Sequence, residues 1–399
     1  MPSVRTAGIL PAVYRRLLAV VRRHVGGYNR QQFRRHGPLG SRRYGCRWLD
    51  GRKATGNNSG DNRQQASPES RRRNKPPEKN CRYEKYHVEF GGDEKTRKTN
   101  YTDMVNKYYD LATSFYEFGW GESFHFADRW KGESLKESIK RQEHFLALQL
   151  GLKRGMRVLD VGCGIGGPLR EISRFSFVSI TGLNNNEYQI ARATELNRLA
   201  GLGNSCDFVK ADFMKMPFRD NTYDAIYAIA ATCHAPDVFG CYKEIYRVLK
   251  PGQCFAAYEW CMTDQYDPTN ENHKKIKAEI EIGNGLPDIR STHQCLDALQ
   301  KAGFEVIWEK DFATDSPLPW YLPMDTSHFS MSSLPSTAIG RFMTRVMVRV
   351  LEFVRLAPAG SMRVSSLLEK AADGLATGGR KEIFTAIYFF LARKPLTES

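Results

Sequence analysis

A glycine-rich turn that begins with an acid is the first feature of the sequence that indicates ligand chemistry. It reads DVGCGIGGP over residues 160–168 and follows an apolar run. Glycines let a backbone turn tightly and approach a ligand, and Pro168 suits the first turn of a following helix. Gly162, Gly164 and Gly166 are therefore predicted to bind either a dinucleotide or S-adenosylmethionine. The structural alternative is a plain tight turn in a Rossmann-like sheet.

Polar residues near the ends of three apolar runs favour S-adenosylmethionine. Asp160 is suited to its ammonium group, directly or through water. Asn184 stands where an acid that binds ribose is usual, and its amide can bond the same hydroxyls. Asp212 and Phe213 follow the third run, where they can bond and stack on adenine. The order of these motifs resembles that of class I S-adenosylmethionine-dependent methyltransferases.

An aromatic segment upstream, YEFGWGESFHF over residues 116–126, indicates where a second substrate binds. It has five aromatic rings and two carboxylates but no clean period of 2 or 3.6 residues. This composition favours a ligand-facing loop, with an aromatic core turn as the alternative.

Four strings of the sequence resemble sterol C-24 methyltransferases. They are the aromatic segment, the glycine turn, YAIAATCHAP over 227–236 and YEWCMTD over 258–264, and IGNGLP over 282–287 continues the likeness. The resemblance covers residues 82 to 397 and is strongest to the plant cycloartenol-type branch. It implies transfer of a methyl group from S-adenosylmethionine to C-24 of a side-chain alkene, as in the conversion of cycloartenol to 24-methylenecycloartanol.

The resemblance also implies the chemistry that side chains must perform. The alkene is the nucleophile, so the first step needs positioning in a dry pocket and no base. The resulting cation needs aromatic faces, and a carboxylate or histidine must accept the final proton. The predicted catalytic residues are Glu259, His234, Glu117 and Tyr116. The predicted substrate-binding residues are Phe118, Trp120, Glu122, Phe124, His125, Phe126 and Trp260, and no metal is implied.

Ala230 departs from the family pattern, which usually has glutamate before ATCHAP. If that carboxylate stabilises the cation or removes the proton, a weakly active or noncatalytic sterol-binding protein is an alternative function. A second-step enzyme acting on 24-methylenelophenol is another. A methyltransferase for a quinone or tocopherol precursor would not require the aromatic segment.

The elements that position these residues follow from the apolar pattern. Runs over 157–161, 178–183, 207–209, 223–229 and 253–258 alternate with helix-length segments, which predicts a doubly wound parallel sheet. Runs over 304–308 and 383–392 add two late strands. The fold class is therefore α/β, a Rossmann-like, seven-stranded, mostly parallel sheet with N-terminal helices and a C-terminal sterol-binding elaboration.

Helices are predicted around 101–116, after a capping box formed by Ser134 and Glu137, and over 339–356. We expect four segments. They are a basic disordered or targeting-like tail (1–80), a helical and aromatic substrate cap (81–150), the S-adenosylmethionine-binding domain (151–312) and a C-terminal sterol methyltransferase region with the last strand (313–399).

Charge is concentrated in the tail. Residues 1–80 contain 19 Lys or Arg and four Asp or Glu, a net charge equal to the +15 of the whole chain. The rest of the chain is neutral, which argues against a nucleic-acid-binding body. Nine cysteines without a CxxC pair indicate reduced thiols.

No apolar run approaches the ~20 residues needed to cross a bilayer, so any membrane contact is predicted to be peripheral. The basic amphipathic pattern over 339–356 fits either an anionic membrane surface or packing on the domain. We expect the cytosolic face of the endoplasmic reticulum membrane, or an organelle addressed by the tail. The resemblance implies a homo-oligomer.

Overall fold

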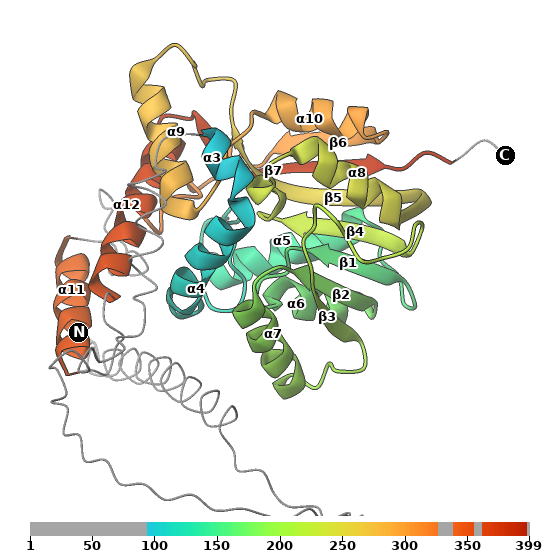
Figure 1. Cartoon of the computed structure of the whole chain (residues 1–399), viewed down its shortest axis with the longest axis horizontal. Coiled ribbons are helices and arrows are strands. Elements are labelled where there is room, and N and C mark those ends of the chain that lie inside the picture. Colours follow the sequence, from blue (N-terminus) through green and yellow to red (C-terminus); the bar gives the residue numbers. More distant parts are fainter. Residues whose placement is uncertain (1–93, 326–337, 355–360, 397–399) are drawn as a thin grey trace, which may run out of the picture. The chain divides into compact units, whose positions relative to one another are not determined.

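The computed structural model describes residues 94–325, 338–354 and 361–396 (Figure 1). Its centre is a seven-stranded sheet in the order β3-β2-β1-β4-β5-β7-β6. The first five strands are parallel, and β7 runs antiparallel to both β5 and β6. The strands are β1 (Arg157–Val161), β2 (Ser179–Asn184), β3 (Cys206–Lys210), β4 (Tyr223–Ile229), β5 (Leu249–Met262), β6 (Glu305–Asp311) and β7 (Phe384–Arg393).

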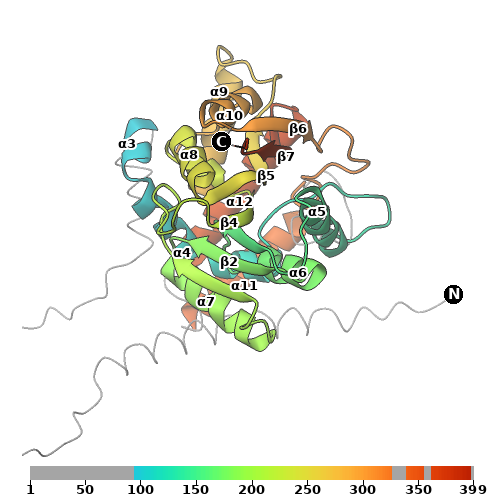
Figure 2. The same ribbon diagram turned by 90° about the vertical axis from the view of Figure 1, so that its right-hand side faces the viewer.

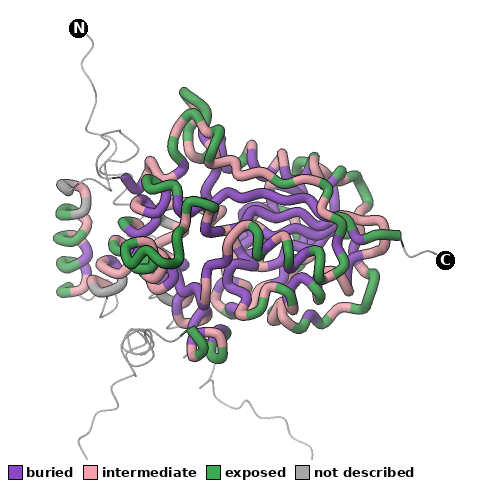
Figure 3. Tube along the Cα trace, turned by 90° about the horizontal axis from the view of Figure 1, so that it is seen from above, coloured by how far each residue is buried: buried purple, intermediate pink, exposed green. Residues whose placement is uncertain are grey.

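The predicted sheet is confirmed, because each of the seven apolar runs forms a strand. The central strands β1, β4 and β7 are buried along most of their length, as expected for strands covered by helices on both faces, whereas the edge strands β3 and β6 are partly exposed. Seen from above in Figure 3, the strands form the buried centre of this part of the chain. Nine of the ten residues of β7 are buried.

Helices cover both faces of the sheet (Figure 2). One face packs against α5 (Leu135–Gln149), α6 (Gly167–Ser176) and α7 (Glu187–Leu199). The other packs against α8 (Val238–Val248) and α10 (Thr292–Lys301). The predicted capping box at Ser134 is present, as is the proline in the first turn of α6.

The remaining elements lie on the side of the sheet where the parallel strands end (Figure 1). They are α3 (Glu94–Thr99), α4 (Tyr101–Gly119), the short 3-10 helix η2 (Thr232–His234), α9 (Glu271–Asn284), α11 (Ala338–Phe353) and α12 (Ser361–Arg380). Helix α12 packs against α9, and α11 packs against α12. Among the described residues, no helix is long and apolar enough to cross a bilayer.

Three details differ from the sequence prediction. Helix α4 continues to Gly119, so the aromatic segment begins as helix and becomes a loop only at Trp120. The helix α12 was not predicted. Helix α11 ends at Phe353 rather than 356. The tail over residues 1–80 lies outside the described residues, and its boundary stays a prediction.

Candidate active site

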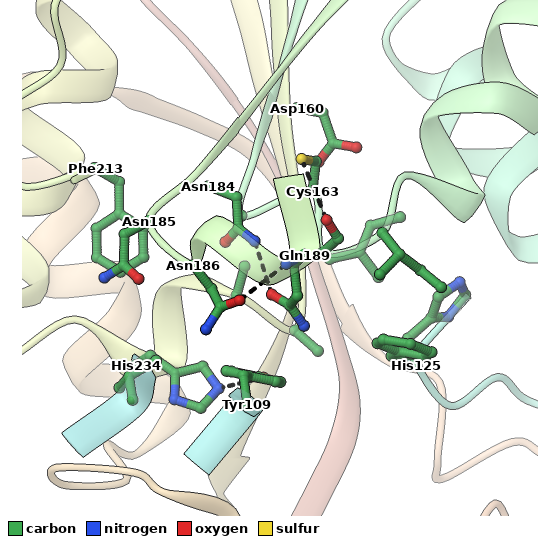
Figure 4. A pocket seen from close by; sticks show the side chains of 18 of the residues that line it. Tyr109, His125, Asp160, Cys163, Asn184, Asn185, Asn186, Gln189, Phe213 and His234 are labelled. Atoms are coloured by element: carbon green, nitrogen blue, oxygen red, sulfur yellow. Dashed lines mark hydrogen bonds between the residues drawn. The ribbon is translucent and has the colours of Figure 1, made fainter. Parts of the chain in front are cut away.

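One pocket lies at the carboxyl ends of the parallel strands (Figure 4). Its walls are the glycine turn after β1, the β2–α7 turn, Phe213 after β3, the turn after β4, helix α4 and the aromatic segment. The lining residues are Tyr101, Val105, Tyr109, Glu122, Phe124, His125, Asp160, Gly162, Cys163, Gly164, Ile165, Pro168, Asn184, Asn185, Asn186, Gln189, Phe213, Ile229, Ala230, Ala231 and His234. The crevice outside the strand ends is where open α/β sheets bind ligands.

The glycine turn is built so that side chains are excluded from the pocket floor. Gly162, Gly164 and Gly166 have φ angles of 80°, 54° and 75°, a region that favours glycine. A Cβ on Gly162 would also overlap the side chain of Ala231, and one on Gly166 would lie 3.0 Å from Phe208. Space and backbone conformation therefore both require glycine at positions 162 and 166. Gly162 and Gly164 line the pocket, whereas Gly166 does not.

Asp160 is the acid that faces this turn, and it is 3% exposed. The hydroxyl of Tyr227 donates a hydrogen bond to its Oδ2 at 3.0 Å. Burial raises the pKa of Asp160 to about 7, against the lowering effect of Tyr227. A buried carboxyl group without a cationic partner suits a ligand that brings an ammonium group.

The β2–α7 turn supplies three consecutive asparagines, which Figure 4 shows beside one another. The Nδ2 of Asn184 donates to Gln189 Oε1 at 2.7 Å. Asn186 caps α7 and donates to Asp110 Oδ1 at 3.0 Å, so it ties α7 to α4. The Oδ1 of Asn185 is buried and has no hydrogen-bond partner among the described residues. Asn185 therefore has an acceptor that a ligand hydroxyl or amine would satisfy.

Only one of the two residues predicted to bind adenine faces the pocket. Phe213 lines it and stacks with Tyr101 at a ring-centroid distance of 6.4 Å. The carboxyl group of Asp212 instead accepts hydrogen bonds from the hydroxyl of Tyr101 and, at 2.9 Å, from the amide of Met214. Asp212 thus holds α4 and the loop that carries Phe213, which is a different task from the predicted one.

Part of the aromatic segment reaches the pocket. Glu122, Phe124 and His125 line it, and Arg170 donates to Glu122 Oε2 at 2.7 Å. His125 is buried, with Nδ1 2.9 Å from the carbonyl oxygen of Phe126 and Nε2 3.3 Å from Glu143 Oε1. The side chain of Phe118 lies outside the described residues.

The other aromatic residues pack behind Phe124. Tyr116 lies 5.6 Å from Phe124 and 6.0 Å from Trp120 between ring centroids. Phe126 contacts Trp120 and Trp260 at 5.8 and 6.0 Å. The Nε1 of Trp260 is buried and unpartnered among the described residues. These rings form a continuous cluster that begins at the pocket.

His234 lies in the pocket wall and pairs with a residue that sequence reasoning missed. Its Nδ1 donates to the carbonyl oxygen of Gly285 at 3.2 Å, so its Nε2 accepts the hydroxyl of Tyr109 at 2.9 Å (Figure 4). Burial lowers the pKa of His234 to about 4, so the ring is neutral near pH 7. Tyr109 lies in an unremarkable helical pattern, and no spacing in the sequence links it to a residue 125 positions later.

Glu259 does not face the pocket. It is 1% exposed, and its Oε1 accepts a hydrogen bond from Thr232. Ala257 and Cys261, two residues before and after Glu259 in β5, pack in the core beneath α8 and α10. Burial raises the pKa of Glu259 well above the ordinary glutamate value, although Arg290 opposes the shift. Its place in the structure is below η2, where it holds the turn that carries Ala231 and His234.

Glu117 and Tyr116 are also bound elsewhere. The carboxylate of Glu117 forms an ion pair with Arg192, with Nε 3.1 Å from Oε2. The hydroxyl of Tyr116 is bonded to that of Tyr108, and burial raises its pKa to about 12. Neither residue lines the pocket. Because α4 is helical to Gly119, positions 109, 113 and 117 follow one another along one face of the helix. Thr113 and Glu117 contact α7 through Gln189 and Arg192, and only Tyr109, one turn earlier, reaches His234.

Ala230 lines the pocket with its backbone in a left-handed conformation, φ 49°. Its amide donates to the carbonyl oxygen of Tyr258 at 2.8 Å. In the described ranges, no three His, Cys, Asp or Glu side chains gather in a way that would hold a metal ion, and all seven described cysteines are free thiols.

A mostly parallel sheet with an antiparallel strand between β5 and β6, a glycine cradle and a buried acid defines a class I S-adenosylmethionine-dependent methyltransferase. Solved structures agree on the fold. A cyclopropane synthase of Mycobacterium tuberculosis superposes with a TM-score of 0.58 at 17% identity, covering 73% of this chain and 98% of its own. The [4+2]-cyclase SpnF superposes with a TM-score of 0.55 at 23% identity, covering 73% and 95%.

Sequence relatives define the family. A methyltransferase domain matches residues 159–257, and the sterol methyltransferase C-terminal family matches residues 331–396. The cycloartenol-C-24-methyltransferase of Arabidopsis thaliana is 74% identical over 79% of this chain and 94% of its own length. The sterol 24-C-methyltransferase of Saccharomyces cerevisiae is 49% identical over 76% and 81%. The chain belongs to the sterol 24-C-methyltransferase family.

Proposed function

We propose that this enzyme transfers the methyl group of S-adenosylmethionine to C-24 of cycloartenol and forms 24-methylenecycloartanol. The observation that carries the proposal is the 74% identity to cycloartenol-C-24-methyltransferases of Arabidopsis thaliana and rice, which the chain matches over more than nine-tenths of their length. The donor pocket supports it, because the residues at the strand ends suit an amino acid, a ribose and an adenine.

Different pocket residues suit different parts of the donor. Asp160 would face the ammonium group, Asn184 and Asn185 would offer amide atoms to the ribose, and Phe213 would cover the adenine, since all four line the pocket. When bound, S-adenosylmethionine supplies an electrophilic methyl group to the side-chain alkene. Phe124 and Ala230 both line this pocket, so we place the alkene beside them.

The aromatic cluster is suited to the cation that follows methyl addition. Aromatic faces stabilise a cation by ~0.5–2 kcal/mol each without bonding to it covalently. Phe124 lines the pocket, and Tyr116 and Trp120 stand directly behind it. A hydride then shifts from C-24 to C-25, and the transferred carbon must lose a proton.

The Tyr109–His234 pair is the proton acceptor that the geometry supports best. Tyr109 accepts the proton at its oxygen while its own proton passes to His234 Nε2, 2.9 Å away. A neutral imidazole is a weak base here, but a C–H bond beside a carbocation is a strong acid, so a weak base suffices. We prefer this pair to Glu259 and Glu117, because those carboxyl groups are hydrogen-bonded to Thr232 and Arg192 and neither residue lines the pocket.

Replacing Tyr109 tests this route. We expect Tyr109→Phe to lower single-turnover methylation by about a hundredfold, the usual worth of a positioned proton acceptor, with donor affinity kept within a few-fold. Tyr188→Phe is the matched control, because that hydroxyl bonds Ser114 outside the pocket. Full activity of Tyr109→Phe would assign the proton to another group.

We also propose that the enzyme acts at the cytosolic face of the endoplasmic reticulum membrane as a peripheral homo-oligomer. A sterol has one hydroxyl group, so it resides in bilayers, and burial of its carbons at ~0.8 kcal/mol per CH₂ dominates its affinity. Addressing of an organelle by the basic tail is the alternative. Fractionation of the tagged full chain, with crosslinking, distinguishes these locations and the oligomeric state.

Single-turnover incubation with labelled donor and either cycloartenol or 24-methylenelophenol tests the main proposal, with products identified by mass spectrometry. A 24-methylene product from cycloartenol supports it, and conversion of 24-methylenelophenol alone assigns the second methylation step. Absence of product with intact donor binding would point to Ala230. Ala230→Glu, whose carboxylate would enter the pocket, should then restore turnover.

A further inference from the structure

Helix α11 exposes a run of large apolar side chains. Phe353 is 87% exposed and Phe342 is 64% exposed, whereas a phenylalanine side chain is usually buried. We name the exposed apolar residues of this segment the outer stripe; they are Phe342, Met343, Val346, Val350, Phe353 and Val354. Their spacing of three and four residues places them on one side of the helix. An apolar surface of this kind on a folded protein marks a contact with another apolar body.

The opposite side of α11 explains how the helix is held. Val348 and Leu351 are buried, and α11 packs against α12. Figure 3 shows α11 at the margin of the described part, with its exposed positions facing outward. The outer stripe is therefore not needed to attach α11 to the enzyme.

Positively charged residues beside the outer stripe indicate which kind of surface it contacts. Arg345 and Arg349 are exposed and border the stripe on one side of the helix, by their position in the 3.6-residue turn. Arg345 also pairs with Glu369 of α12, with Nε 3.0 Å from Oε2. Residues 1–80 carry a net charge of +15, so these arginines disfavour that segment as the occupant. An apolar stripe flanked by arginine matches acyl chains beneath anionic headgroups.

We propose that the outer stripe of α11 docks on an anionic lipid bilayer, with Phe342, Val346 and Phe353 entering the acyl boundary. The position of α12 fits this role. Its residues Leu367 and Leu368 pack against the buried cluster that contains Tyr108. Tyr108 contacts Tyr116, and Tyr116 contacts the pocket residue Phe124. One helix therefore separates the docked surface from the aromatic cluster, so a sterol leaving the bilayer would travel a short way. The passage of a sterol from the bilayer to the pocket rests on the proposed function.

Position-specific fluorescence tests the docking without relying on the tail. In the full chain, Phe353→Trp should add emission that is quenched by vesicles of phosphatidylcholine and phosphatidylserine with brominated acyl chains. Phe177→Trp is the matched control, since Phe177 is 68% exposed after α6, far from α11 in the chain. Equal quenching at both positions, or none at Phe353→Trp, would overturn the proposal.

Binding to equimolar phosphatidylcholine–phosphatidylserine vesicles gives the second measurement. Changing Phe342, Val346 and Phe353 together to glutamine should weaken cosedimentation by at least about tenfold in salt that screens the tail. The same change at Leu148, Phe177 and Leu199, all exposed, should not. If the α11 variant instead dissociates a dimer and vesicle binding is unchanged, the stripe contacts a second copy and the proposal fails.

Activity separates this proposal from the assignment of the reaction. The α11 variant should methylate sterol supplied in cyclodextrin as fast as the unmodified enzyme, and only sterol supplied in vesicles more slowly. Inactivity of the unmodified enzyme would contradict the proposed function while leaving the vesicle measurements intact. Equal rates on vesicle sterol would overturn the docking role.

Discussion

At the scale of single residues, Asp160 is where burial and ligand charge compete. Burial favours its neutral form and raises its pKa to about 7, whereas a bound ammonium group favours the carboxylate. Donor binding must therefore release a proton whenever the pH is below about 7. The affinity of the site for its donor is consequently linked to pH through this one side chain.

We predict that the affinity for S-adenosylhomocysteine, which carries the same ammonium group, rises about fivefold to tenfold from about pH 6 to pH 7.5. The sign follows because only ionised Asp160 binds the cation, and its ionised fraction rises over this range. The α-amino group of the ligand, with an ordinary pKa of about 8, stays mostly charged. Calorimetry on Asp160→Asn should show weaker binding without this slope. Asp212→Asn should keep the slope, because Asp212 is outside the pocket; loss of the slope there would contradict the assignment.

Glu259 gives a second residue-scale prediction. Burial raises its pKa well above the ordinary value and so favours the neutral carboxyl group, whose closest mimic is glutamine. Glu259→Gln should retain activity within a few-fold, whereas replacement of a catalytic base at this position would cost about a hundredfold or more. The folded state holds the proton more tightly than the unfolded chain, so the stability of the unmodified enzyme falls as pH rises above the unfolded pKa of Glu259. Thermal unfolding should therefore show the melting temperature of Glu259→Gln rising relative to that of the unmodified enzyme as pH is raised above about 5.

Most residues predicted to hold the donor line the pocket, whereas of the predicted catalytic residues only His234 does, for a physical reason. The glycine turn and Asn184 are local, because each follows directly from the strand that precedes it. Glu259 satisfied the same strand-end rule, but side chains of a strand alternate between faces, and position 259 belongs to the α8 and α10 face. The Tyr109–His234 contact joins two elements far apart in sequence, which only the fold brings together.

At the scale of elements, the strands were predictable and some helices were not. Buried strands of a parallel sheet are near-continuous apolar runs, so each was visible. Helix α12 contains Gly374, Gly378 and Gly379, residues that weaken a helix prediction. In the structure these glycines let α12 approach its neighbours closely: a Cβ on Gly379 would overlap Tyr321, and one on Gly378 would lie 3.0 Å from Ile280. Tertiary packing therefore outweighs intrinsic propensity in this helix.

The α9–α12 interface offers a matched pair of glycine substitutions. A Cβ on Gly283 of α9 would lie 2.7 Å from the backbone of Ala371, while one on Gly374 would meet its nearest atoms at 3.5 Å. We expect Gly283→Ala to destabilise the enzyme by about 1–3 kcal/mol, because backbone cannot yield as a flexible side chain does. Gly374→Ala should stabilise it by about 0.5–1 kcal/mol through helix propensity. Denaturant unfolding measures the free energy of unfolding of both variants. Equal changes in that free energy would show that α12 shifts to make room for a Cβ on Gly283.

At the scale of the whole molecule, the net positive charge and the pocket residues lie in different parts of the sequence. Residues 1–80 carry a net charge equal to that of the whole chain, and the remainder is neutral. The Arabidopsis relative is matched over 94% of its length by 79% of this chain, so about a fifth of the chain has little counterpart there. The pocket, its cap α4 and the helices α11 and α12 all lie after residue 93. The described residues of the donor site and of the aromatic cluster all belong to the neutral part of the sequence.

We therefore predict that removal of residues 1–80 leaves the melting temperature, the donor affinity and the methylation rate on cyclodextrin-supplied sterol unchanged, while retention on heparin is lost. Heparin and nucleic acid bind positive charge, which the deletion removes, whereas every described residue of the pocket remains in the shortened chain. The measurements are a thermal melt, calorimetry with S-adenosylhomocysteine, single-turnover methylation and salt elution from heparin. A control in which the arginines of residues 1–80 are changed to glutamine should lose heparin retention in the same way. A fall in methylation rate with the deletion but not with the glutamine control would mean that residues 1–80 act on the enzyme through contacts other than charge.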